Sequence, residues 1–247
     1  MSRVFIDVGG YHGESSRAAL DPLFEFDRIF CFEPVGSCAA KIRTINNRRL
    51  VVIEACLLDR NGQLPIHNPG TLAASIYGDA PVYGGEFTAQ TVNAIDVVDF
   101  FASFLGPDDE VWMKLNCEGA ECDILDRLLG SRHLEILKNV LVDFDAGKIP
   151  SQHHRVPATM AKLGEKGVNY CVPEDVQFGM VNNFGGIRNW LVVSGAANRG
   201  IKARLGSLVY NLSIVVRHPE CSGYHKMKLL ETFPFLSIFA RSRRRTA

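Results

Sequence analysis

The chain has 247 residues, of which 47% are hydrophobic and 22% charged, and this composition is that of an ordinary globular protein. Its length suits one large α/β domain, or a domain with a tail, and is sufficient to bury a sizeable core. Lys and Arg together number 27, as do Asp and Glu, so the formal net charge is zero. The overall charge therefore gives no indication of a nucleic-acid partner.

Charge is distributed unevenly along the chain. Residues 199–247 contain ten Lys/Arg and two Asp/Glu, a net charge of +8, so residues 1–198 carry −8. We therefore expect two regions, a domain over residues 1–198 and a basic, apolar C-terminal extension over residues 199–247.

Cysteine usage indicates the compartment. The seven cysteines include no CxxC pair, and an odd number without metal-ligand spacing favours free, buried thiols in a reducing environment over a zinc site. Neither a signal peptide nor an uninterrupted apolar stretch of about 18 residues is visible. We expect a cytoplasmic protein.

In the first quarter of the chain, short apolar runs alternate with helical segments. The strands expected here are Val4–Val8, Arg28–Phe32 and Leu50–Leu58, and the helices are Glu14–Leu20 and Val35–Asn46. Residues 63–92 have weak periodicity and many turn-forming residues, which predicts a hairpin or a long loop.

The same alternation continues through the rest of the domain. Helices are expected at Ala94–Leu105, Ala120–Leu129 and Pro157–Lys166, and strands at Glu110–Asn116, Asn139–Phe144, Val168–Val172 and Asn189–Val193. Such alternation predicts an α/β fold with a doubly wound, mostly parallel sheet of seven strands. A further helix is expected over Ile201–Val216.

The first strand leads into a glycine loop, Asp7–Gly13, before the first helix. Glycines at this point let the backbone approach a ligand at the carboxyl edge of a parallel sheet. The spacing of Gly9, Gly10 and Gly13 is not GxGxxG, the spacing that a dinucleotide pyrophosphate prefers. By itself the loop fits a nucleotide cradle and an ordinary strand–helix turn equally well.

An acidic residue at the end of the second strand favours the nucleotide interpretation. Glu33 follows Gly13 by 20 residues, and a carboxylate there can accept hydrogen bonds from both ribose hydroxyls. The alternative is an acid at a helix N-terminus that is stabilised by the helix dipole.

The fourth strand ends in a second group of polar residues, and we expect it to lie beside the first strand at a common crevice. Because side chains alternate along a strand, Lys114, Asn116 and Glu118 should share one side. A buried lysine needs a partner, for which Asp7 is a candidate; the alternative is a lysine that reaches water. Glu121 fits a helix N-terminal acid, whereas Glu118 is the better catalytic candidate.

Five segments in order resemble the motifs of FkbM-type methyltransferases. The opening Phe5-Ile-Asp-Val-Gly-Gly-Tyr-His-Gly-Glu-Ser-Ser16 is similar to that family's first motif, and Phe32-Glu-Pro34 to its FEP. The other three segments are Ala55–Gly62, Ala94–Asp99 and, most specific of all, Met113-Lys-Leu-Asn-Cys-Glu-Gly-Ala-Glu121. Together the segments cover roughly residues 3–145.

The resemblance implies a Rossmann-like class I methyltransferase that uses S-adenosylmethionine for O-methylation, often of a glycan hydroxyl or another small natural product. It also implies the site residues. Asp7, Gly9, Gly10 and Gly13 would line the methionine end, Glu33 would bind the ribose, and Ser75 and Asn116 would lie near the cofactor.

Three positions depart from the family pattern. Asn116 replaces an Asp, Gly10-Tyr11 replaces Ala-Asn, and the segment Asp143-Phe144-Asp145 lacks the usual histidine. The loss of a carboxylate at Asn116 argues against a base or metal role at this position.

Methyl transfer to a hydroxyl needs a group that accepts the proton. Glu118 is the first candidate, Asp143 or Asp145 the second and His12 the third, with Lys114 as a further residue of the catalytic group. A divalent ion shared by Glu118, Glu121 and Asp143 is not indicated by spacing, so no metal is expected.

Competing interpretations concern both the tail and the fold. Residues 232–247 are aromatic and then basic, which fits peripheral contact with an anionic membrane or a packed extension with a solvated end.

An NAD(P)-dependent oxidoreductase or epimerase would share Glu33 and use a Tyr-x-x-x-Lys pair, which occurs here only at Tyr224 and Lys228. A non-catalytic, methyltransferase-like binding module is the third interpretation.

Overall fold

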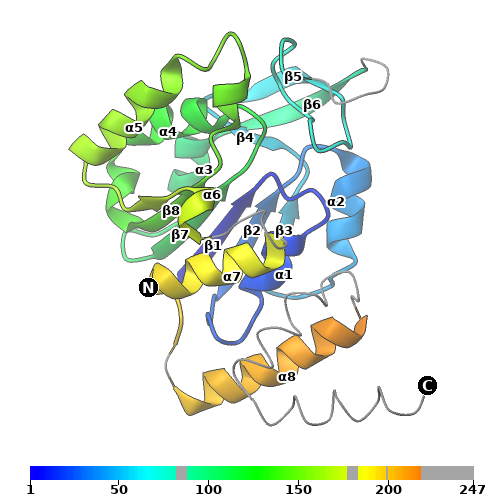
Figure 1. The fold of residues 1–247 in the computed structure, drawn as a ribbon, viewed down its shortest axis with the longest axis vertical. Coiled ribbons are helices and arrows are strands. Elements are labelled where there is room, and N and C mark those ends of the chain that lie inside the picture. The colour runs from blue at the N-terminus through cyan, green and yellow to red at the C-terminus, as the bar shows by residue number, and fades with distance from the viewer. Residues whose placement is uncertain (82–87, 177–182, 199, 218–247) are drawn as a thin grey trace.

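The computed structural model describes residues 1–81, 88–176, 183–198 and 200–217 of the chain, and its centre is a parallel β-sheet (Figure 1). The sheet has six strands in the order β3-β2-β1-β7-β8-β9, and every neighbouring pair is parallel. In chain order these strands are β1 (Arg3–Val8), β2 (Arg28–Phe32), β3 (Leu50–Ile53), β7 (Glu110–Leu115), β8 (Leu137–Val142) and β9 (Tyr170–Cys171).

Helices cover both faces of this sheet. The helices of the described residues are α1 (Glu14–Ala19), α2 (Gly36–Arg43), α3 (Val97–Phe104), α4 (Glu121–Leu129), α5 (Arg155–Glu165), α6 (Pro173–Val176), α7 (Asn183–Val193) and α8 (Ile201–Arg217). Two 3₁₀ helices, Arg132–Ile136 and Asp145–Lys148, flank β8. The predicted α/β class is therefore confirmed, and the arrangement is compatible with a Rossmann-like fold.

The strands are apolar throughout because each face packs against helices. In β1, Val4, Ile6 and Val8 belong to one core with residues of α3, α4 and α5, whereas Phe5 belongs to a second core with residues of α1 and α7. All four side chains are buried. Continuous apolar runs of this kind are typical of parallel strands covered on both sides.

The predicted neighbourhood of the first and fourth strands is confirmed. β1 pairs with β2 on one side and β7 on the other, so that Val8 lies opposite both Phe32 and Leu115. The carboxyl ends of the three strands are therefore level. The strand order reverses between β1 and β7, and in open α/β sheets such a switch point creates the ligand crevice.

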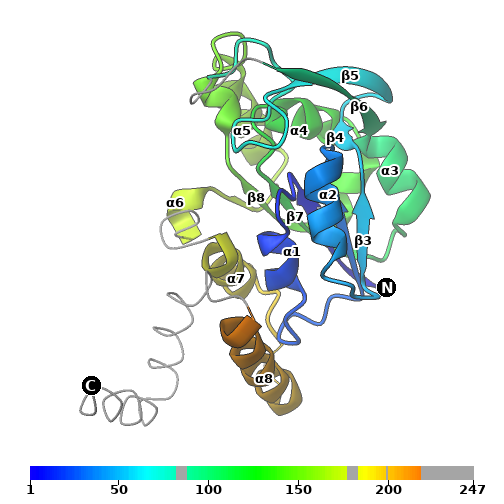
Figure 2. The ribbon, with the colours of Figure 1, turned by 90° about the vertical axis from the view of Figure 1, so that its right-hand side faces the viewer.

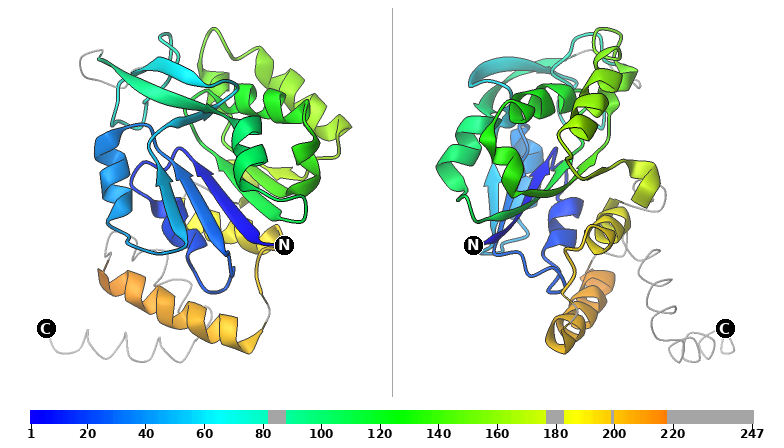
Figure 3. Two further views of the ribbon diagram at one scale, coloured as in Figure 1. Left: turned by 180° about the vertical axis from the view of Figure 1, so that it is seen from behind. Right: turned by 90° about the vertical axis from the view of Figure 1, so that its left-hand side faces the viewer.

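A smaller sheet lies at the carboxyl edge of the central one (Figure 3). It has the order β4-β6-β5, formed by β4 (Cys56–Leu58), β5 (Gly62–His67) and β6 (Ala89–Asp96). β5 and β6 pair antiparallel, so the hairpin interpretation of residues 63–92 is confirmed. The predicted strand Leu50–Leu58 is two strands, because the chain passes from the central sheet to the smaller one after Ile53.

The expected seventh strand, Asn189–Val193, is wrong, because these residues form the second half of α7. The residues that α7 buries include Phe184, Ile187, Trp190 and Leu191, whose spacing of three and four residues is that of a helix. The stretch Asn189–Val193 alone is too short to show the helical spacing of these apolar residues.

Two other boundaries differ from the prediction. The helix expected from Ala94 begins only after Asp96, whose Oδ1 accepts hydrogen bonds from the backbone N–H of Val98 (2.7 Å) and Asp99 (3.1 Å) as an N-cap. Ala94 to Asp96 belong instead to β6. The sixth predicted strand is reduced to Tyr170–Cys171.

The predicted helix in the C-terminal extension is α8, which lies beside α7 and α1 (Figure 2). The stretch 232–247 and the Tyr224–Lys228 pair lie outside the described residues. Among the helices of the described residues, none is long and apolar enough to cross a membrane.

Candidate functional site

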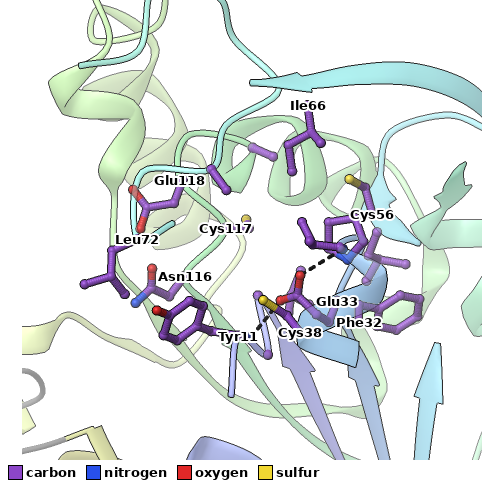
Figure 4. Close-up of a pocket in the computed structure, with 18 of the residues that line it drawn as sticks. Tyr11, Phe32, Glu33, Cys38, Cys56, Ile66, Leu72, Asn116, Cys117 and Glu118 are labelled. Atoms are coloured by element: carbon purple, nitrogen blue, oxygen red, sulfur yellow. Dashed lines mark hydrogen bonds between the residues drawn. The ribbon is translucent and has the colours of Figure 1, made fainter. Parts of the chain in front are cut away.

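A cleft opens at the carboxyl ends of β1, β2 and β7. Its volume is about 950 Å³ with the open space at the mouth included. Figure 4 shows Glu33 on one side of the cleft and Asn116 and Glu118 on the other, with Tyr11 beside Asn116. The cleft therefore lies at the switch point of the sheet.

Glycine is required at positions 9 and 10 by close packing. Gly9 has a φ of +81°, and a Cβ there would lie 1.8 Å from the carbonyl oxygen of Asn116. A Cβ on Gly10 would lie 2.3 Å from the Sγ of Cys31. The N–H groups of both glycines donate to the carbonyl of Phe32, at 3.1 and 3.0 Å. The loop is thus fixed against β2 and β7, and both glycines line the cleft.

A buried ion pair lies beneath this loop. The Nζ of Lys114 is 3.1 Å from Oδ1 of Asp7, and both side chains are almost inaccessible to solvent. The same Nζ donates to the carbonyls of Val8 (3.2 Å) and Gly9 (2.7 Å), while Ser16 donates to Oδ2 of Asp7 (2.8 Å). Two of the three ammonium hydrogens of Lys114 are thus donated to carbonyls of the loop, and the predicted pairing with Asp7 is confirmed as an ion pair.

Glu33 is the polar residue at the base of one end of the cleft. Its Oε2 accepts a hydrogen bond from the backbone N–H of Tyr11 (2.7 Å), and its Oε1 accepts one from Val35 (3.0 Å). Burial raises the pKa of this carboxyl, and the two backbone donors oppose that effect. Each oxygen keeps one further acceptor position, as binding of two adjacent hydroxyls requires.

The wall beside Glu33 is apolar. Cys38 and Cys56 carry thiols whose pKa is raised by burial, to about 12 for Cys56, so both stay neutral near pH 7. A neutral, apolar wall beside an acid suits a ligand with a flat aromatic part next to a pair of hydroxyls. The residues of this wall are Val35, Cys38, Cys56, Leu57, Ile66, Ala74 and Ile76.

Two aromatic side chains follow the glycines. Tyr11 adopts a positive φ of 45°, and its ring stacks on that of His12 with centroids 3.8 Å apart. The Nε2 of His12 is 2.8 Å from the Nζ of Lys41. Burial and the neighbouring charges of Lys41 and Arg17 lower the pKa of His12, so its ring is neutral at pH 7. The contact with Lys41 occupies the nitrogen that would otherwise accept a proton.

Glu118 faces the cleft from a strained turn. Its φ is +54°, and its carbonyl accepts a hydrogen bond from the Oγ of Ser75 (2.6 Å). Burial and the nearby carboxyls of Asp145 and Glu121 raise the pKa of Glu118 to about 8, against the opposing effect of Lys148. This side chain therefore exchanges its proton close to neutral pH.

The neighbouring acids have different surroundings. Glu121 is fully buried, and its Oε1 accepts from the backbone N–H of Cys117 and Gly119, both at 3.1 Å. Its Oε2 accepts from the N–H of Ala146 (3.1 Å), so this carboxyl braces the turn before α4. Burial and Asp145 raise the pKa of Glu121 to about 7.

Asp143 and Asp145 follow β8 on the far side of β7. The pKa of Asp143 is raised to about 6 by burial and by the charge of Asp145, and Asp145 itself is ion-paired with Lys148. Neither acid lines the cleft. Among the residues that the structure describes, no group of His, Cys, Asp and Glu side chains could hold a metal ion.

The structure brings most of the predicted residues to one cleft. Those that line it are Gly9, Gly10, Glu33, Lys114, Asn116 and Glu118. Four predicted residues do not line it, namely Asp7, Gly13, Ser75 and Asp143. The apolar wall was missed, because the Ala55–Gly62 segment that contains β4 was not placed at the cleft, and β5 and the loop after it carry no motif beyond their turn-rich composition.

Comparison with known proteins gave no significant match: no family model matches the chain, and neither a curated protein nor a solved structure is significantly similar to it.

Proposed function

We propose that the chain is an S-adenosylmethionine-dependent O-methyltransferase. The observation that carries this proposal is one cleft with two differently built ends. One end has an acid held by two backbone N–H groups beside an apolar wall, and the other has Glu118 with its raised pKa. The first end suits a nucleoside, and the second suits proton transfer from an acceptor hydroxyl.

The residues present fit the cofactor. Glu33 has free acceptor positions for ribose hydroxyls, and the apolar wall suits an adenine. The loop of Gly9, which packs against Asn116, and Gly10, which packs near Glu33, suits the methionine end. When bound, the cofactor supplies an activated methyl group on a positively charged sulfur. The resemblance of the sequence to FkbM-type methyltransferases supports the same assignment.

Glu118 is the residue that we assign as general base. A base is most effective when its pKa lies near the working pH, and burial brings the pKa of Glu118 to about 8. The charges of Asp145, Glu121 and, least of the three, Asp143 also raise the pKa of Glu118. His12 is the weaker candidate because Lys41 occupies its Nε2.

Lys114 acts as a positioning residue. Its ammonium is committed to Asp7 and to two carbonyls of the glycine loop, which holds the loop in the form that lines the cleft. The acceptor that we propose is a hydroxyl of a glycan or another small natural product, which follows from the sequence resemblance.

Isothermal titration calorimetry with S-adenosylmethionine and, separately, NAD tests the proposal. We expect S-adenosylmethionine alone to bind, and Glu33→Gln to weaken binding by at least about tenfold, since an amide cannot accept from ribose through both of its atoms. Glu135→Gln, at an exposed position of the 3₁₀ helix before β8, is the matched control. Absence of S-adenosylmethionine binding, or preferential binding of NAD, contradicts the proposal.

Turnover is tested separately from binding. With a panel of hydroxylated acceptors, methyl transfer should be lost in Glu118→Gln while cofactor affinity stays within about threefold of the wild type. Asn116 stands where the family has an acid, so a chain that binds the cofactor but transfers no methyl group to any acceptor would be a binding module instead.

A further inference from the structure

Helix α8 is fastened to the domain by a buried polar cluster. Asp21, in the loop after α1, is fully buried, and its Oδ2 accepts from Ser207 Oγ and Asn211 Nδ2, each at 3.0 Å. The same carboxylate is ion-paired with Arg188 of α7. The Tyr210 hydroxyl adds a bond to a carbonyl of α1. These contacts fix which face of α8 is turned inward.

The opposite face of α8 is apolar and exposed. Ile201, Leu205, Val209 and Leu212 expose 77%, 59%, 67% and 45% of their surface. At about 100° per residue, these four side chains and the half-buried Leu208 fall within an arc of about 100°, on the side away from Ser207 and Asn211. A continuous exposed apolar stripe of this kind marks an interaction surface.

Basic residues flank the stripe on both edges. In the same projection Arg204 lies about 40° beyond one edge of the apolar arc and Lys202 about 20° beyond the other. The whole helix, Ile201–Arg217, contains no acidic residue, and neither Lys202 nor Arg204 makes an ion pair with any described residue. Residues 199–247 as a whole carry a net charge of +8.

We infer that the outer face of α8 docks on the surface of an anionic phospholipid bilayer. An apolar stripe with a cation along each edge can enter the headgroup region while Lys202 and Arg204 reach the phosphates. Charge complementarity favours this occupant over α8 of a second copy or the chain's own C-terminal segment, because both are basic. The inference does not depend on the proposed function.

The docked orientation follows from the fold. α8 lies at the end of the domain opposite the small sheet β4-β6-β5, as both Figure 1 and Figure 2 show. The cleft lies on the side of that small sheet, since β4 and β5 contribute to its wall. Docking through α8 therefore leaves the cleft facing away from the bilayer.

Co-sedimentation of the full-length protein with vesicles tests the inference. We expect binding to phosphatidylcholine–phosphatidylserine vesicles, little binding to phosphatidylcholine alone, and loss of binding at high salt. The double variant Leu205→Glu, Val209→Glu should bind at least about tenfold more weakly, and Lys202→Gln with Arg204→Gln should have a similar effect. Met160→Glu, an exposed apolar position on α5, is the matched control and should bind as wild type.

A second set of variants tests the contribution of α8 to vesicle binding independently of the basic residues near the end of the chain. In full-length protein with Arg243, Arg244 and Arg245 replaced by glutamine, the Leu205→Glu, Val209→Glu pair should still reduce the remaining binding at least about tenfold. Circular dichroism melting confirms that each variant is folded. Binding unchanged by the α8 substitutions overturns the inference, as does a variant that loses only self-association in light scattering, which would assign the stripe to a second copy.

Discussion

Glu118→Gln should make the protein more stable, by an amount that grows with pH. In the folded protein the pKa of Glu118 is raised from about 4.5 to about 8 by burial and neighbouring carboxyls. Between these values the native state keeps a proton that the unfolded state has released. The free energy of unfolding therefore falls by about 1.4 kcal/mol for each pH unit in this window.

The glutamine variant removes this pH dependence at one site. At pH 5 the wild-type protein has lost only a small part of this pH-dependent stability, whereas at pH 7 it has lost most of it. From the two pKa values, the stability gained by Glu118→Gln should be about 2–3 kcal/mol larger at pH 7 than at pH 5. Coupling to Glu121, whose own pKa is raised to about 7, makes this difference an upper limit.

Urea unfolding at pH 5, 6, 7 and 8, followed by circular dichroism, measures the effect. Glu135→Gln controls for the loss of one negative charge from the protein as a whole. A stability difference that stays constant between pH 5 and pH 7, or that shrinks, would refute the buried, acid-surrounded environment on which the assignment of Glu118 as a base depends.

Three further substitutions test the framework of the cleft. Gly9→Ala should lower the free energy of unfolding by at least about 2 kcal/mol, because its φ of +81° and a contact of 1.8 Å both exclude a side chain; an unchanged urea midpoint would contradict this. Lys114→Met should cost about 3–5 kcal/mol by leaving Asp7 buried without its cation, and pairing it with Asp7→Asn should recover part of the loss in the same denaturation assay. Asp21→Ala removes the acceptor shared by two residues of α8, so limited proteolysis should cut between α7 and α8 faster than in wild type; equal rates would show that α8 is held by other contacts.

Most of the fold could be predicted from the sequence, because its strands are strongly apolar and its glycines mark the turns. Val4–Val8 and Arg28–Phe32 fall where the structure has β1 and β2, since continuous apolar runs that end in Gly or Pro have few alternatives. The prediction failed at Asn189–Val193, where a short apolar window does not distinguish a strand from half of a helix. It also failed at Leu50–Leu58, where the change of sheet leaves no local signal.

The polar residues of the site were predictable and its apolar wall was not. Glu33 follows β2 directly, and Glu118 comes three residues after the end of β7. Because the carboxyl ends of neighbouring parallel strands lie at one edge of the sheet, the convergence of these two residues follows from the order of the elements. The pairing of Lys114 with Asp7 followed from the cost of burying a lone charge. Cys56 and Ile66 reach the cleft through the small sheet, whose position depends on tertiary packing that a single sequence does not contain.

The two backbone N–H groups that donate to Glu33 can report by NMR on whether the cleft is occupied. The backbone N–H groups of Tyr11 and Val35 end on the same carboxylate that we expect to receive a ligand's hydroxyls. A ligand that donates to Glu33 competes for its electron density, so the amide resonances of these two residues should shift together on titration. Because one amide belongs to the loop after β1 and the other to the start of α2, their joint response would distinguish occupancy of this end of the cleft from binding elsewhere on the protein.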